Sequence, residues 1–172
     1  AIELTIDADS WLIHPLNSEG GRRRIQKLAT DNNIKLQGIC CDIFMEHPLV
    51  GKINERQKDH ATQMLSDLIE CSAKVGLSFI ELPLVGANTI KDEGNKIQFR
   101  RILDWAIPLA EKNNIDILLE TDLPPAELIN FLRLFSSDKL GVNYDTGNST
   151  WFGFDPFEEI TTYHTYIKNI HI

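Results

Sequence analysis

Three short, largely apolar segments of the sequence each end on a residue type that binds metal ions. They are 115–120, which ends on Glu120, 140–145, which ends on Asp145, and 167–171, which ends on His171. Side chains alternate between the two faces of a strand, so each of these residues shares a face with the residue two positions earlier. Those partners are Leu118, Asn143 and Asn169. Two carboxylates and one imidazole form a ligand set that suits a divalent cation.

Helix-like stretches separate these three segments, so we expect them to be parallel strands with right-handed crossovers. The carboxyl ends of such strands lie at the same end of the sheet. In a barrel, that end forms the mouth in which sites are built. The sequence therefore predicts a metal site at the mouth of a parallel barrel, with Glu120, Asp145 and His171 as its ligands.

The same alternation predicts which residues of the other strands point inwards. This inward set is Glu3, Thr5, Asp7, Gly38, Cys40, Asp42 and Glu81. A buried carboxylate that lacks a partner is costly, so it must be protonated, paired with a base or bound to a cation. Because the inward set contains few bases, a divalent ion is the simplest source of compensating charge.

Each of the three residues also has a simpler interpretation. Glu120 reads as a solvated residue at a strand end, and His171 as a structural imidazole with satisfied hydrogen bonds. Asp145 begins the sequence Asp-Thr-Gly-Asn, in which the Asp side chain commonly accepts hydrogen bonds from the following backbone amides. Three potential ligands at three consecutive strand ends are more simply explained by one metal site than by a separate structural role for each residue.

The chain as a whole alternates strand-like and helix-like segments. The strand-like segments are 1–6, 35–41, 77–82, 115–120, 140–145 and 167–171, and the helix-like segments are 20–32, 54–75, 97–112, 124–135 and 156–166. This order predicts an α/β fold of the (β/α)8 TIM-barrel type, here an incomplete barrel of about six parallel strands without the first and last β/α units. A complete open sheet of six strands is the alternative. No linker or repeat divides the chain, so we expect a single domain over 1–172, the central part of a barrel.

Composition limits the classes of partner. A formal net charge of −8 disfavours nucleic acid, and the sequence has no basic stripe beyond Arg22, Arg23 and Arg24. No apolar run is long enough to span a bilayer, and no signal-peptide pattern opens the chain, so we expect a cytoplasmic protein without a membrane partner.

Five segments together carry a resemblance to a known family. They are 2–7 (IELTID), 37–42 (QGICCD), 119–122 (LETD), 144–148 (YDTGN) and 170–172 (IHI). This combination resembles the xylose isomerase-like TIM barrel superfamily. Within it, the chain is similar to the sugar-phosphate isomerases and epimerases related to L-ribulose-5-phosphate 3-epimerase and hexulose-6-phosphate isomerase.

The resemblance implies that Glu120, Asp145 and His171 are three of four ligands of one divalent ion, and that Glu120 also moves a proton. It further implies that Asn148 faces the substrate, and we expect Glu81 of the inward set to bind substrate as well. The fourth ligand of the family, a glutamate on the eighth strand, has no counterpart in these residues. The ligand types fit Mn²⁺, Mg²⁺, Co²⁺ or Zn²⁺ without ranking them.

The resulting hypothesis is a metal-dependent isomerase or epimerase of a ketose or ketose phosphate, acting through a metal-stabilised enediolate. We expect the intact protein to be a homo-oligomeric enzyme, whereas these residues alone are expected to be inactive. Two alternatives stay open. One is an inactive or metal-free scaffold or binding module on the same fold, and the other is a zinc nuclease like endonuclease IV, whose metal cluster is rich in His.

Overall fold

The sheet contains six strands in the computed structural model, which describes residues 1–7 and 11–172. The strands are β1 (Ile2–Thr5), β2 (Leu36–Cys40), β3 (Phe79–Leu84), β4 (Asp116–Thr121), β5 (Leu140–Asp145) and β6 (Ile167–His171). They are hydrogen-bonded in the order of the sequence, and every neighbouring pair is parallel. The predicted α/β fold, an incomplete TIM barrel of six parallel strands, is confirmed.

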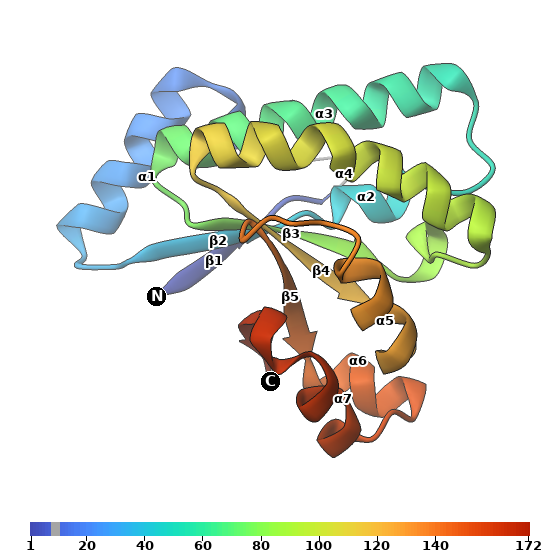
Figure 1. Ribbon diagram of the computed structural model, residues 1–172. Coiled ribbons are helices and arrows are strands. Elements are labelled where there is room, and N and C mark those ends of the chain that lie inside the picture. Colours follow the sequence, from blue (N-terminus) through green and yellow to red (C-terminus); the bar gives the residue numbers. More distant parts are fainter. Residues whose placement is uncertain (8–10) are drawn as a thin grey trace.

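Helices connect the strands and cover the sheet. They are η2 (Pro15–Asn17), α1 (Glu19–Asp31), α2 (Ile43–Glu46), α3 (Glu55–Val75), η3 (Gly86–Asn88), α4 (Glu93–Asn113), α5 (Pro125–Leu132), α6 (Thr146–Phe152), α7 (Pro156–Tyr163) and η4 (His164–Tyr166). Figure 1 shows α1, α3 and α4 in one layer over β1 to β4, while α5, α6 and α7 gather beside β5. Among residues 1–7 and 11–172, no helix combines the length and the hydropathy that a membrane span requires.

Helix α3 illustrates how local sequence sets these elements. The side chain of Asn54 accepts a hydrogen bond from the backbone N–H of Gln57, and the Gln57 side chain accepts one from the backbone N–H of Asn54. This capping box satisfies two free donors at the start of the helix. The helix ends at Val75 and is capped by Gly76, whose φ of 86° suits glycine. One face of the helix is buried along its length: Ala61, Met64, Leu65, Leu68, Ile69, Ser72 and Val75.

The two faces of the sheet differ in composition. The face towards the helices is apolar, and its fully buried residues include Ile39, Ile80, Ile117 and Leu119. The opposite, concave face carries Phe79 and Leu118 beside the buried polar residues Glu81, Glu120 and Asn143. A buried polar side chain needs a hydrogen-bond partner or a functional explanation, so the concave face is where a site is expected.

One close approach on the concave face requires glycine. The Phe79 ring lies over Gly38 of the neighbouring strand, and a Cβ atom at residue 38 would be 2.2 Å from that ring. The absence of a side chain at Gly38 therefore lets Phe79 fill the interior of the curled sheet.

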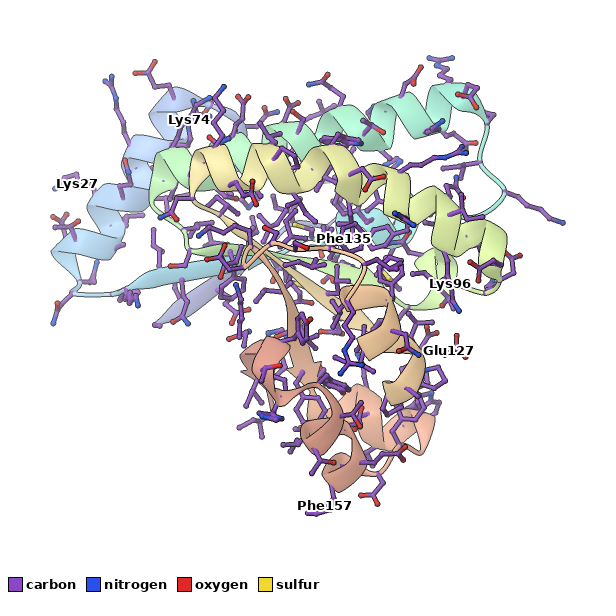
Figure 2. All side chains as sticks on the ribbon, viewed as in Figure 1. Lys27, Lys74, Lys96, Glu127, Phe135 and Phe157 are labelled. Atoms are coloured by element: carbon purple, nitrogen blue, oxygen red, sulfur yellow. The ribbon has the colours of Figure 1, made fainter. Side chains whose placement is uncertain are left out.

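Several element boundaries differ from the sequence prediction. Helix α4 begins at Glu93 rather than at residue 97, because Asp92 caps it by accepting from the Asn95 backbone N–H. Lys96 of this additional turn forms an ion pair of 2.7 Å with Glu127 of α5, and Figure 2 shows the two side chains between the helices. Helix α5 ends at Leu132 rather than at 135, and α6 occupies residues 146–152, for which the sequence predicts no helix.

Candidate metal centre

Glu120, Asp145 and His171 lie at the carboxyl ends of β4, β5 and β6. Nδ1 of His171 is 3.6 Å from Oε2 of Glu120 and 3.8 Å from Oδ2 of Asp145. One ligand atom from each residue can be chosen so that all three lie within 4.8 Å of one another. Two atoms that bind the same ion at about 2.1 Å are roughly 3 to 4 Å apart, so this spacing suits one shared cation.

Asp145 combines two roles through its two oxygens. Its Oδ1 accepts a hydrogen bond of 2.7 Å from the backbone N–H of Asn148 and thereby caps α6. Its Oδ2 faces His171. The local turn interaction and a place in the cluster are therefore compatible, because each uses a different oxygen.

Two asparagine amides orient the Glu120 carboxylate. Asn143 Nδ2 donates to Oε2 at 2.7 Å, and Asn148 Nδ2 donates to Oε1 at 2.5 Å. Asn143 Nδ2 is also 3.0 Å from Nδ1 of His171. These amide N–H groups contact atoms that could also bind a cation, and they hold the Glu120 carboxylate and the His171 ring close together.

The other side of the imidazole faces two more carboxylates. Nε2 of His171 is 3.0 Å from Oε2 of Glu3 and 3.5 Å from Oε2 of Glu81. Glu3, Glu81 and His171 form a second group whose ligand atoms lie within 4.8 Å of one another. His171 therefore stands between two acidic pairs, with one ring nitrogen directed to each.

Glu81 has an unusual environment among these acids. Only 1% of the residue is exposed, and its Oε2 has no hydrogen-bond partner within residues 1–7 and 11–172. Burial, together with the nearby Glu120 and Glu3 carboxylates, raises the pKa of Glu81 to about 9. At neutral pH this side chain is therefore a neutral carboxylic acid that can donate a hydrogen bond.

The cluster carries excess negative charge. In the described part of the chain, no Lys or Arg forms an ion pair with Glu3, Glu81, Glu120 or Asp145, and His171 is the one basic group paired with them. Four acids around one imidazole favour protons or cations strongly. The same field, after burial as the main cause, raises the pKa of the Cys40 thiol, which contacts Asp42 and Glu81.

In the described part of the chain, a cavity of substrate size lies away from this cluster. A cavity of about 500 Å³ is lined by residues that include His47 and His60, whereas the cavity beside Glu120 and Asp145 measures about 20 Å³. The His171 and Asp145 side chains nevertheless keep 31% and 24% of their surface exposed. These two side chains of the cluster are therefore accessible to solvent in the described part of the chain.

The helices behind β5 support the cluster through a buried network. Glu159 of α7 accepts hydrogen bonds from the Tyr144, Ser149 and Tyr163 hydroxyls. Tyr144 belongs to β5 and Ser149 to α6, so the network joins β5, α6 and α7. It fixes α6, which carries Asn148, against the strand that ends in Asp145.

The structure brings all five predicted site residues into one region, since Asn148 contacts Glu120 and Glu81 lies beside His171. Sequence reasoning gave no role to Asn143 and Asn169, and it named Glu3 only as an inward residue. The alternation of side chains along a strand could have identified both asparagines. Asn143 and Asn169 lie two positions before Asp145 and His171, and therefore on the same strand faces.

The comparisons with known proteins place this arrangement in a family. The family model described as Xylose isomerase-like TIM barrel matches residues 1–172. A comparison with curated protein sequences gave no match. The chain belongs to the xylose isomerase-like TIM barrel family.

Solved structures share the fold at low sequence identity. A D-psicose 3-epimerase from Clostridium cellulolyticum H10, solved with D-tagatose, is 18% identical with a TM-score of 0.79, over 98% of this chain and 62% of that one. A xylose isomerase domain protein from Planctomyces limnophilus is 16% identical with a TM-score of 0.78, over 98% and 62% of the two chains. A 3-keto-D-glucoside 4-epimerase from E. coli is 11% identical with a TM-score of 0.72, over 92% and 65%. The chain thus spans less than two thirds of the length of these proteins.

Proposed function

We propose that Glu120, Asp145 and His171 bind one divalent cation, Mn²⁺, Mg²⁺, Co²⁺ or Zn²⁺. The observation that carries this proposal is the convergence of one atom from each residue within 4.8 Å, from three different strands. Oxygen and imidazole donors suit these ions, and the uncompensated acids favour positive charge at this position.

The proposed activity is isomerisation or epimerisation of a ketose or ketose phosphate. The cation would polarise the carbonyl and an adjacent hydroxyl of the sugar, which acidifies the carbon between them. Glu120 would accept or return the proton at a carboxylate oxygen, and its amide partners Asn143 and Asn148 hold that carboxylate in a fixed orientation. The names of the structural neighbours, which include two sugar epimerases, support this class of substrate.

Two further residues are proposed to contact the sugar. Asn148 is half-buried at the start of α6 and already contacts Glu120. Glu81, with a pKa raised to about 9, would donate a hydrogen bond to a sugar oxygen rather than repel it. The cytoplasmic location and the homo-oligomeric state of the enzyme stay predictions.

The test uses the complete natural polypeptide with Glu120→Gln, Asp145→Asn and His171→Ala. We expect each variant to lose bound metal, measured by elemental analysis, and to lose at least about 100-fold in ketose isomerisation, because a cation bound by three residues depends on each of them. Glu46→Gln is the matched control, since Glu46 is exposed on α2. Wild-type activity and metal content in all three variants would exclude the proposed site.

A metal-free binding module is a second candidate, favoured by one observation. The Asn143 and Asn148 amides already satisfy lone pairs of Glu120 and His171, so the cluster can be stable without an ion. Thermal denaturation against Mn²⁺ concentration separates the two candidates. An ion that binds only the folded state stabilises it by about 2.7 kcal/mol at 100 times its Kd, whereas a metal-free module shows no shift.

A further inference from the structure

The two nitrogens of the His171 ring both face acids, but their nearest neighbours are chemically different. Nδ1 lies 3.0 Å from Asn143 Nδ2, which is a donor, whereas Nε2 lies 3.0 Å from a carboxylate oxygen of Glu3. A donor needs a lone pair opposite it, and a carboxylate needs an N–H. Both contacts are satisfied by the same tautomer, in which Nε2 carries the hydrogen and Nδ1 carries the lone pair.

The Asn143 amide orientation is fixed independently of His171. Its Oδ1 accepts a hydrogen bond of 2.8 Å from Asn169 Nδ2, and its Nδ2 donates to Glu120 at 2.7 Å. Reversing the amide would place an oxygen against the Glu120 carboxylate, so the donor must face Glu120 and His171. The assignment of the His171 tautomer therefore follows from a network that starts on other residues.

Glu3 belongs to β1, at the opposite edge of the sheet from His171 on β6. Five strand spacings in a flat sheet would separate these edges by about 24 Å, so the contact exists because the sheet is curled. Glu3 uses both oxygens for β6: Oε1 accepts from Asn169 Nδ2 at 2.9 Å, and Oε2 accepts from His171. The carboxylate is thus held in place by two residues of one strand.

We propose that Glu3 is a positioning residue for His171, which it reaches across the concave face of the sheet. By accepting the Nε2–H hydrogen bond, Glu3 fixes the ring orientation and leaves the Nδ1 lone pair directed towards Glu120 and Asp145. The expected effect of Glu3 on cation affinity rests on the proposed function. A carboxylate partner of this kind orients a histidine that binds a metal and increases its basicity. Glu81 is the weaker partner of Nε2, since its oxygen is 3.5 Å away.

The first measurement is made on the metal-free wild-type protein. Long-range ¹H–¹⁵N correlation spectra of histidine-labelled protein, with His171 assigned by loss of its signals in His171→Ala, report which nitrogen carries the hydrogen. A dominant Nε2–H tautomer supports the role of Glu3. A dominant Nδ1–H tautomer overturns it, even if no Glu3 variant folds.

The second measurement compares Glu3→Ala, Glu3→Gln and the control Glu46→Gln in the complete natural polypeptide. We expect the Mn²⁺ Kd of Glu3→Ala, measured by isothermal titration calorimetry, to be 10 to 100 times that of wild type, together with a mixed tautomer. Glu3→Gln should give an intermediate Kd, because its single oxygen can accept from only one of His171 and Asn169.

The outcomes separate this inference from the metal site itself. If wild-type protein binds no Mn²⁺, the proposed function fails, while the wild-type tautomer still decides the role of Glu3. If wild type binds Mn²⁺ and Glu3→Ala keeps the wild-type Kd, the inference is wrong and the metal site stands. A raised Kd of Glu3→Ala with an unchanged His171 tautomer also overturns the inference, because Glu3 would then affect Mn²⁺ binding through general folding alone.

Discussion

Glu81 and Glu159 are both buried carboxylic residues, with 1% and 4% of their surface exposed, yet they lie in opposite kinds of environment. Glu159 accepts hydrogen bonds from three hydroxyls on β5, α6 and α7. Glu81 accepts one weak contact, from the Cys40 thiol at 3.5 Å, and its Oε2 has no hydrogen-bond partner in the described ranges. A buried acid with several donors contributes to stability, whereas one without them is costly to ionise.

The neighbours of the two acids show the same difference. Burial and the Glu159 carboxylate raise the pKa values of the Tyr144 and Tyr163 hydroxyls, which therefore stay protonated and keep donating. Around Glu81 the neighbours are acids, so the proton resides on Glu81 itself. One region is a completed structural network, and the other has an oxygen directed towards the candidate site.

The largest effect on stability is expected at Glu159. Glu159→Ala leaves three buried hydroxyls without their acceptor and should lower the free energy of unfolding by about 3 kcal/mol. Urea denaturation followed by circular dichroism measures this loss.

The adjacent Glu158→Ala is the matched control, because Glu158 is exposed in the same turn of α7. It should change stability by less than about 0.5 kcal/mol. Equal losses in the two variants would show that the hydroxyl network around Glu159 contributes nothing of its own.

Glu159 also marks the limit of what the sequence predicts. Strand parity, carried over from the strands that end in Glu120, Asp145 and His171, correctly put Glu81 on the inward face. No comparable pattern distinguishes Glu159 from the exposed Glu158 beside it. Its burial depends on how α7 packs against α6 and β5, which is a tertiary arrangement.

Helix α6 and the Glu3 contact were missed for related reasons. Residues 146–152 include Gly147, Asn148 and Ser149, which have low helix propensity, so the sequence carries no helix signal there. The Asp145 cap and the Ser149 contact with Glu159 stabilise the helix instead. The meeting of Glu3 with His171 depends on the curl of the whole sheet, and residue spacing within single strands carries no information about it.

Glu81→Gln should change the pH dependence of stability. The pKa of Glu81 is raised from 4.5 to about 9 in the folded protein, so between these values the folded state binds more protons than the unfolded state. Stability of the metal-free wild type should therefore fall as pH rises through this window, by at most about 1.4 kcal/mol per pH unit from this residue. Gln resembles the protonated acid and cannot ionise, so the variant should lack this fall.

The measurement is urea denaturation in EDTA at several pH values from 5 to 8, with Glu46→Gln as the control. Over the lower half of that pH range, we expect the free energy of unfolding of the wild type and of the control to fall by about 2 kcal/mol relative to that of Glu81→Gln. Parallel pH profiles for wild type and Glu81→Gln would mean that Glu81 ionises normally and that the contrast with Glu159 does not exist.

The smallest effect is expected for Tyr163→Phe, which removes one of the three donors to Glu159. The Tyr163 hydroxyl donates to Oε1 of Glu159 at 2.8 Å, while the Tyr144 and Ser149 hydroxyls both contact Oε2. The change therefore removes the donor to Oε1 and leaves the contacts of Oε2 in place. The free energy of unfolding should fall by about 1 kcal/mol, as for a typical buried hydrogen bond. In a double-mutant cycle with Glu159→Ala, Tyr163→Phe should cost little more, because the acceptor is already gone. Additive losses in that cycle would show that the Tyr163 hydroxyl stabilises the protein without acting through Glu159.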